Sequence, residues 1–501
     1  MTNPTIQQAP AEDPGKMGPS DMTIANPPMA IVSVLAVLYA SAYFLGERLL
    51  QLFFVPAAAL DKALRWTRLF QRLPLLWLPV ASIAAAFGAI SGLPMAFERG
   101  LLAGGLACIL WSLVIVAACV AHAGATTPGT SIADIEQRAT QRWPEKWYAR
   151  HLAKPIDAHY VRALIANSLM IVPAVIALLW PAGPTIPAVL LYAVALLSIS
   201  RSQEELDHCD IHNNLFSSSH LAPGFAKVGV WLTSQYLRVV LNPLCSRIPH
   251  FYRIHHVYMH HVENNGAEDL QTTMHADRTS FHDFCVHALK LAVSNSFGVD
   301  LYSYLVRKRR YREVRQLLAG MVGWFAALAL IAAYSPVGAA VVLIVHFLGA
   351  VPGAINTYIW HGFVDPDDPE NVYLNTVNSV VNPDVLLVGS LHLRHHIKGG
   401  EHWTKQAAMT PAESDACLQK SVVLLSPLPG NALLSALWRD RMDIIATRVR
   451  PLPGQASSDM VDMLRRRTRP KVAAPSSNLT RWIDRSIGKL FANHLLMGAK
   501  V

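Results

Sequence analysis

Apolar stretches about as long as a bilayer is thick recur along the chain, with longer polar segments between them. A transmembrane helix needs roughly 20 mostly apolar residues. This length predicts seven spans, at 28–50, 74–97, 100–122, 163–180, 185–200, 316–334 and 337–358. Helix breakers at 180–184 and at Ser335-Pro336 join the last four spans into two hairpins. The pattern predicts an all-α integral membrane protein with about seven transmembrane helices.

The composition supports a membrane protein. Of 501 residues, 52% are hydrophobic and only 15% are charged, against about 25% charged in an ordinary soluble protein. Six cysteines without a C-x-x-C pair suggest neither a disulfide framework nor a thiolate zinc site. The net charge of +9 is not gathered into a nucleic-acid-binding motif, so we expect no nucleic acid partner.

Positive charge near helix ends predicts the orientation, because Lys and Arg are retained on the cytoplasmic side. With seven spans and the amino terminus outside, the outside segments hold only Lys16 and Arg99, whereas the short loop 51–73 carries four Lys or Arg. The large polar segments are therefore expected to be cytoplasmic. We divide the chain into an N-terminal tail with three additional spans (1–125), a central domain (126–410) and a C-terminal cytoplasmic extension (411–501).

Histidines form unusually dense groups in the segments predicted to be cytoplasmic. Nine of the 21 histidines are His208, His212, His256, His260, His261, His361, His392, His395 and His396. One H-x-x-x-H pair is expected about once by chance, but an H-x-x-H-H triple only about 0.04 times. Together the groups predict a metal site.

Helical spacing predicts how these imidazoles share metal ions. Residues at i and i+4 lie on one helix face, so His208 with His212, and His256 with His260, can each bind one ion. His261 points about 100° around the helix from His260, so the second-box triple can serve two neighbouring ions. His392 and His395 are expected to share a face while His396 turns away. Nine imidazoles exceed the three or four ligands of one zinc site, which indicates a histidine-rich di-metal site. Imidazole suits zinc, iron, copper and nickel alike.

At these residues the sequence resembles the membrane fatty acid desaturase and hydroxylase superfamily, whose signature is three histidine boxes around membrane hairpins. The resemblance covers about residues 160–410. It extends to the stretch 260–269 (HHVENNGAED) and to the stretch 361–369 (HGFVDPDDP).

The resemblance implies a specific chemistry. It implies two Fe ions held by all nine histidines, with no catalytic residue beyond these ligands. O2 would be the co-substrate, and a lipid acyl chain would be the substrate. Since the chain has no dinucleotide fingerprint or Cys-rich cluster motif, an external electron donor is implied, such as a ferredoxin-like carrier with a reductase.

Several functions stay open at this point. The second box has three residues before its double His, a spacing closer to alkane hydroxylases, so an alkyl, fatty acid or carotenoid-type hydroxylase is the alternative to a fatty acyl desaturase. A non-redox metal-binding transporter or sensor is a second alternative, and a zinc hydrolase a third. His255 can replace His256 if the helix register differs.

Several polar residues are candidates for supporting roles. Carboxylates that can orient the imidazoles are Asp207, Asp210, Glu263, Asp269 and Asp384, and Asn356 is a candidate to hold a metal-bound water. The basic run 465–471 is interpreted as a solvated face, with contact to anionic lipid as the alternative.

Overall fold

The computed structural model is mostly helical. It describes residues 32–41, 132–141, 143–179, 186–245, 247–379, 392–406, 410–426, 430–452, 454, 456–470 and 478–498. The spans predicted at 74–97 and 100–122 lie outside these residues, and only Val32–Ser41 of the span predicted at 28–50 is described, as an apolar helix. The count of seven spans therefore stays a prediction.

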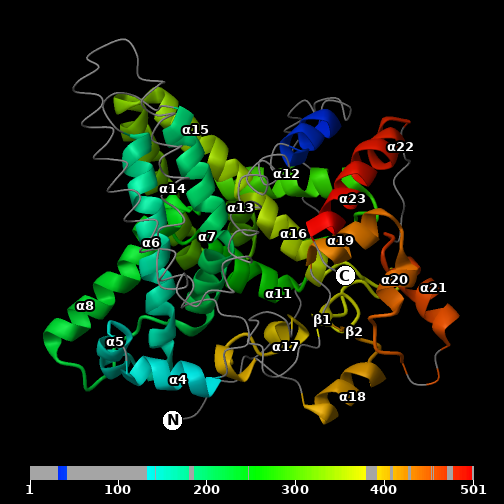
Figure 1. Ribbon diagram of the computed structural model, residues 1–501, viewed down its shortest axis with the longest axis horizontal. Helices are drawn as coiled ribbons and strands as arrows, with labels where there is room; N and C mark the ends of the chain where they lie inside the picture. The colour runs from blue at the N-terminus through cyan, green and yellow to red at the C-terminus, as the bar shows by residue number, and fades with distance from the viewer. Residues whose placement is uncertain are drawn as a thin grey trace, which may run out of the picture.

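The first predicted hairpin consists of α6 (His159–Leu178) and α7 (Ile186–Asn213), which pack along one another (Figure 1). Helix α7 continues 13 residues past the predicted span 185–200, through a stretch of strong helix formers that includes Gln203, Glu204 and Glu205. This extension carries His208 and His212 beyond the apolar part of the helix.

The second hairpin consists of α14 (Tyr311–Tyr334), α15 (Pro336–Leu348) and α16 (Ala350–Trp360). Ser335 caps α15, since its side chain accepts a hydrogen bond from the Gly338 N–H, and Pro336 occupies the first helical position, where no N–H is needed. His361 follows the end of α16 directly.

Within the described residues, three helices are long and apolar enough to cross a membrane: Pro155–Ile176, Tyr311–Tyr334 and Pro336–Trp360. They agree with the spans predicted at 163–180, 316–334 and 337–358. From Leu318 to Ala333, the exposed side chains of α14 are apolar, among them Val322 and Leu330. Such a surface suits lipid better than water.

Shorter elements surround the hairpins. Before α6 lie α4 (Ile132–Gln141), α5 (Glu145–His151) and η3 (Pro155–Ala158). Between the hairpins lie α8 (Gly224–Gln235), η4 (Tyr236–Leu241), α9 (Asn242–Leu244), α10 (Phe251–His255), η5 (His256–His260), α11 (His261–Glu263), α12 (Phe281–Phe297) and α13 (Val299–Arg307). Both η4 and η5 are turns of π-helix.

After the second hairpin, β1 (Val377–Ser379) pairs in parallel with β2 (Val423–Leu425), a small departure from the all-α prediction. The helices that follow β1 are α17 (His392–Ile397), η6 (Trp403–Lys405), α18 (Pro411–Gln419), α19 (Gly430–Trp438), α20 (Met442–Ala446), α21 (Ser457–Arg467), α22 (Asn478–Ile483), η7 (Asp484–Gly488) and α23 (Lys489–Gly498). Helices α19 and α23 pack together, and α19 also contacts α16 (Figure 1).

The basic run at 465–471 corrects a prediction, because it is not simply a solvated face. Arg467 is 3% exposed and its Nε lies 3.3 Å from an oxygen of Asp365. Arg466 bridges Asp365 and Asp367 at 2.9 and 2.6 Å. These arginines bind the loop that follows His361, so the C-terminal region supports the histidine site.

Candidate metal centre

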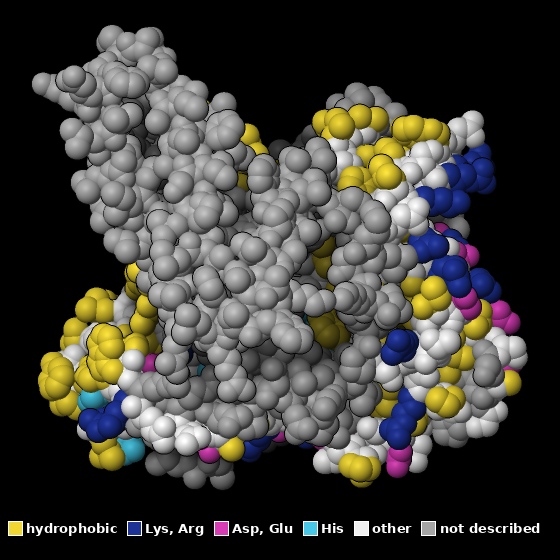
Figure 2. Space-filling model, viewed as in Figure 1, with side chains coloured by type: hydrophobic (Ala, Val, Ile, Leu, Met, Phe, Trp, Pro, Cys, Tyr) yellow, Lys and Arg dark blue, Asp and Glu magenta, His cyan; other side chains and the backbone are white. Residues whose placement is uncertain are grey.

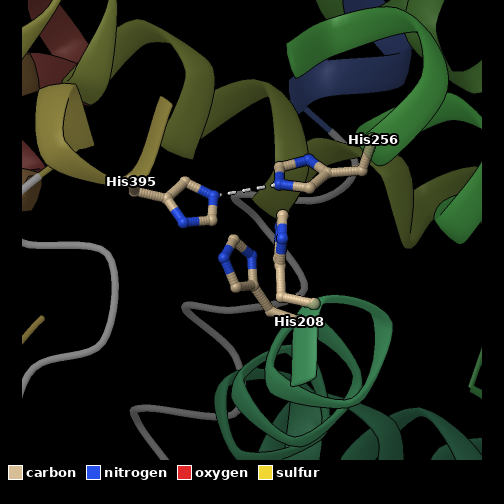
Figure 3. A group of neighbouring side chains, drawn as sticks. His208, His256 and His395 are labelled. Carbon is tan, nitrogen blue, oxygen red and sulfur yellow. Dashed lines mark hydrogen bonds between the residues drawn. The ribbon is translucent and has the colours of Figure 1, made fainter. Parts of the chain in front are cut away.

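Four separate segments bring the predicted histidines together in the interior of the protein. One cluster contains His208, His212, His256 and His395, and a second contains His260, His361, His392 and His396. Within each cluster, one ring nitrogen of every residue lies within 4.8 Å of the others, so each cluster could hold a metal ion. Figure 3 shows three rings of the first cluster, from three different elements, pointing toward one another.

In the first cluster, His208 and His212 lie one turn apart on α7, with their ring centroids 5.0 Å from each other. This agrees with the predicted i, i+4 pair. The Nε2 atoms of His208 and His212 are buried, and neither has a hydrogen-bond partner among the described residues. Two orphaned imidazole nitrogens in a cluster of four are what a metal-binding site predicts, because a buried polar atom without a partner is otherwise costly.

The second box departs from the predicted pairing. His256 belongs to the first cluster and His260 to the second, so the expectation that they bind one ion is wrong. The physical reason is that 256–260 forms a π-helical turn, whose i to i+5 spacing brings His261, rather than His260, one turn from His256. The Nε2 atoms of His256 and His261 are 3.2 Å apart.

His261 lies where the two clusters meet. Its Nε2 is 2.9 Å from the Nε2 of His395, and its ring stacks on His396 with centroids 4.7 Å apart. All nine predicted histidines therefore lie in one region. His255, the alternative to His256, is outside both clusters, and its Nε2 is 4.0 Å from a carboxylate oxygen of Asp269.

The third box also differs from the prediction. On α17, His392 and His396 both belong to the second cluster, and their Nε2 atoms are 3.0 Å apart. His395 belongs to the first cluster. The predicted i, i+3 pair is wrong because α17 follows the i, i+4 geometry of a regular α-helix here. The adjacent residues His395 and His396 of this short helix thus belong to different clusters.

Hydrogen bonds from outside fix the rings of the second cluster. The Nδ1 of His260 is 2.6 Å from a carboxylate oxygen of Asp269, and the Nδ1 of His361 is 2.7 Å from the Asn375 carbonyl oxygen. Both oxygens only accept hydrogen bonds, so each Nδ1–H donates, and a neutral ring then presents the lone pair of its Nε2 to the cluster. The Nδ1 of His396 similarly lies 2.9 Å from the side-chain oxygen of Asn264.

Of the four predicted carboxylates within the described residues, only one orients an imidazole. Asp269 does, whereas Asp207 binds Arg247, Asp210 binds Arg238, and Glu263 binds Tyr304 and Lys308. Asp384 lies outside the described residues. Asn356 donates to Glu204 at 2.8 Å, so this contact already uses the side chain that was a candidate for holding water.

Sequence reasoning missed Asn264, Asn375 and Tyr252, whose hydroxyl is 3.2 Å from the Nδ1 of His208. Asn264 stands within the family-like stretch 260–269, which was a usable signal. Asn375 contacts His361 through its backbone carbonyl oxygen, which any residue type could supply. Tyr252 contacts His208, which lies 44 positions earlier in the chain. No local sequence pattern therefore indicates either contact.

Burial keeps these imidazoles neutral. It lowers the pKa of His208, His256, His392, His395 and His396 well below the usual value near 6.5. It also lowers the pKa of His212 to about 4 and that of His361 to about 3. Neutral imidazole is the form that binds divalent transition metals.

The donor set fits metal ions in its geometry as well. Neighbouring Nε2 atoms are 2.9–3.3 Å apart in both clusters. Nitrogens bound about 2.1 Å from a common ion lie about 3.0–3.4 Å from each other. Lone pairs facing one another at this spacing repel unless a proton or a cation lies between them.

The fold and the two clusters define a membrane protein with a histidine-rich candidate metal centre. Residues 184–426 match the family model for fatty acid desaturases, and these residues include all nine histidines. The match confirms the resemblance to the membrane fatty acid desaturase and hydroxylase superfamily, whose members are metal-dependent. No curated protein and no solved structure matches the chain.

Proposed function

We propose that the protein is an O2-dependent di-iron enzyme that introduces a double bond into a lipid acyl chain. The observation that carries this proposal is the convergence of nine imidazoles from four segments on two adjoining clusters, within the region that matches the desaturase family. The family supports a membrane desaturase or hydroxylase. Iron, O2 and desaturation are our inference from the chemistry.

The two clusters divide the ligands between the proposed ions. His208, His212, His256 and His395 would hold one iron with His261 as a fifth donor, and His260, His361, His392 and His396 would hold the other. Bound iron would supply an oxidant strong enough to remove hydrogen from an unactivated methylene, which no amino-acid side chain can do. A set of neutral imidazoles adds no negative charge to the ions.

The protein's own contribution is orientation and the exclusion of water. Asp269 and Asn375 accept the Nδ1–H of His260 and His361, and thereby aim each Nε2 lone pair at the cluster. The four histidines of the second cluster are 1–7% exposed, which limits the access of bulk water to this cluster.

The balance of the reaction requires an external reductant. Conversion of –CH2–CH2– to –CH=CH– with O2 consumes two electrons and two protons and releases two waters. Since the sequence has no dinucleotide fingerprint or Cys-rich cluster motif, we propose a ferredoxin-like carrier with a reductase. By the distribution of Lys and Arg, the catalytic side would be cytoplasmic.

Hydroxylation is a second candidate, favoured by the π-helical turn at 256–260. This turn accommodates the additional residue that gives the second box its alkane hydroxylase-like spacing. Hydroxylation consumes the same O2, electrons and protons, but one oxygen atom enters the product and only one water is released. The position of the acyl chain beneath the ions would decide between the two outcomes.

Product analysis in a lipid-producing host tests the proposal. Wild type should yield acyl chains about 2 Da lighter than the substrate for desaturation, or about 16 Da heavier for hydroxylation. His395→Ala should abolish either product, because His395 faces both His256 and His261. His220→Ala, at an exposed histidine outside both clusters, is the matched control.

Metal analysis separates a di-iron enzyme from a transporter, a sensor or a zinc hydrolase. We expect about two irons per chain in the purified protein. A protein that carries only zinc and yields no new lipid would contradict the proposal and favour one of those three functions.

A further inference from the structure

A pocket beside the first cluster has an unusual concentration of arginines. Arg238, Arg247 and Arg253 line it together with His250, Asp207 and Tyr252. These residues come from α7, η4, α10 and the loop before α10. None of them belongs to the metal clusters.

Two of the three guanidiniums are already neutralised. Arg238 makes two hydrogen bonds to Asp210, at 2.7 and 3.0 Å, and Arg247 binds Asp207 at 2.5 Å. In the described part of the chain, the Arg253 side chain has no hydrogen bond or ion pair. The pocket thus carries one uncompensated positive charge, and its neighbour Asp207 is already held by Arg247.

His250 lies close to the same positive charges. Burial, together with the nearby Arg238 and Arg253, lowers the pKa of its imidazole. A neutral His250 can donate a hydrogen bond to an anion without adding a second charge. The pocket therefore offers one full charge and several N–H donors, which suits a singly charged anion.

The pocket adjoins the metal site through Tyr252. This side chain lines the pocket, and its hydroxyl is 3.2 Å from the Nδ1 of His208. The guanidinium of Arg247 lies over the same ring, 4.1 Å from its centroid. A molecule held by its charged end here would have its remainder close to the first cluster.

Exposed apolar side chains follow the pocket-lining Arg238 in sequence. Val239 and Val240 of η4 are 46% and 44% exposed, and the hydrophobic side chains of the preceding helix α8 gather on the surface (Figure 2). On the other side, Gly320 of α14 approaches the backbone of Pro249, next to His250. A pocket between an apolar surface helix and a membrane-spanning helix is placed where lipid headgroups lie.

From this arrangement we infer that the pocket binds the anionic headgroup of the acyl substrate, a carboxylate or a phosphodiester, through Arg253. The inference rests on the proposed function, which supplies the acyl chain, and adds the class of headgroup. Arg253 would act as a binding residue that anchors one end of the substrate.

Direct binding to the purified full-length chain in a nonionic detergent tests this inference. The probes are palmitate, palmitoyl lysophosphatidylglycerol and the neutral hexadecanol, titrated without O2 or reductant. Arg253→Gln should weaken the binding of at least one anionic probe about tenfold or more, since hydrogen bonds to charged groups are the strong ones. Hexadecanol should bind both proteins equally.

Three variants sharpen the test. Arg253→Lys keeps the charge and should retain most of the affinity, and His250→Asn should weaken the anionic probes without removing a charge. His250 has a φ of +66°, which Asn tolerates better than most residues. Arg312→Gln, at an exposed position of α14 outside the pocket, is the matched control.

The outcomes are distinct. Selective loss of palmitate binding, of lysolipid binding or of both supports the inference and identifies the headgroup. Unchanged binding of both anions by Arg253→Gln and His250→Asn, or an equal loss for hexadecanol, overturns it. Because binding requires neither iron nor turnover, failure of the proposed reaction would appear separately, as wild type that binds lipid but forms no product.

Discussion

Replacement of Asp269 by Asn tests whether the second cluster is a metal site oriented by its surroundings. Asp269 is 3% exposed and accepts hydrogen bonds from the His260 Nδ1 at 2.6 Å and from the backbone N–H groups of Asn265 and Gln271 at 3.1 and 2.9 Å. Asn keeps the size and one acceptor oxygen, but it loses the negative charge that polarises the imidazole.

The expected magnitude follows from that loss. Loss of the outer partner of a metal-binding histidine typically costs about 10- to 100-fold in metal affinity, or about 1.4–2.7 kcal/mol. Only His260 among the four rings of the second cluster contacts Asp269, so the effect should be confined to one of the two ions. At limiting metal, we expect about one iron per chain in place of two.

The assay is titration of metal-free protein with Fe2+ under anaerobic conditions, followed by metal analysis of the desalted protein. Glu263→Gln is the matched control, because this carboxylate stands in the same segment but binds Tyr304 and Lys308 instead of an imidazole. Equal iron content in wild type and Asp269→Asn at limiting metal would refute the reasoning. So would an equal loss in both variants.

Other predictions concern stability. Gly320→Ala should lower the free energy of unfolding by about 1–3 kcal/mol, because a Cβ there would lie 2.0 Å from the Pro249 carbonyl oxygen. Gly323→Ala is the control, because a Cβ at Gly323 would meet no atom within 4 Å. Comparison of the melting temperatures of the two variants tests this prediction. Arg278→Met should cost about 3 kcal/mol or more in the same assay, since its buried guanidinium donates to several backbone carbonyls. Burial lowers the pKa of the His287 imidazole from 6.5 to about 4. Between these values the unfolded chain binds the proton more readily, so the free energy of unfolding is unaffected above pH 6.5 and falls as the pH decreases toward 4. His287→Gln should reduce this pH dependence by about 2–3 kcal/mol, measured by denaturation at several pH values. Chelation of the metal should lower the melting temperature and Fe2+ should restore it, and equal melting curves would contradict bound metal.

The sequence predicted which histidines meet, because their density exceeds chance and helical hairpins limit where they can lie. It did not predict how the rings are shared. The expectation that His256 pairs with His260 assumed a regular α-helix, and one π-helical turn replaces that partner by His261. A single additional residue in a turn leaves no signature in hydrophobic periodicity, so this error could not be avoided from the pattern alone.

Long-range partners were beyond the sequence for a different reason. Arg466 and Arg467 bind Asp365 from about 100 positions away, yet a run of arginines looks the same whether it faces solvent or a buried carboxylate. Asp269 was predictable because it lies nine residues from His260 in a family-like stretch. Apart from the histidines themselves, contacts between residues distant in sequence could not be inferred.

These long-range contacts explain how a site made of distant segments keeps its shape. The backbone carbonyl of His361 accepts a hydrogen bond from Thr273 at 2.6 Å, and the Asp365 loop that follows is held by Arg466 and Arg467. Asn378 of β1 accepts from the backbone N–H of Leu393, next to His392, at 2.8 Å. Since β1 pairs with β2, the residues after position 410 support two of the four rings of the second cluster. These contacts hold the two rings through their backbones and flanking residues, and they leave the Nε2 atoms facing the cluster.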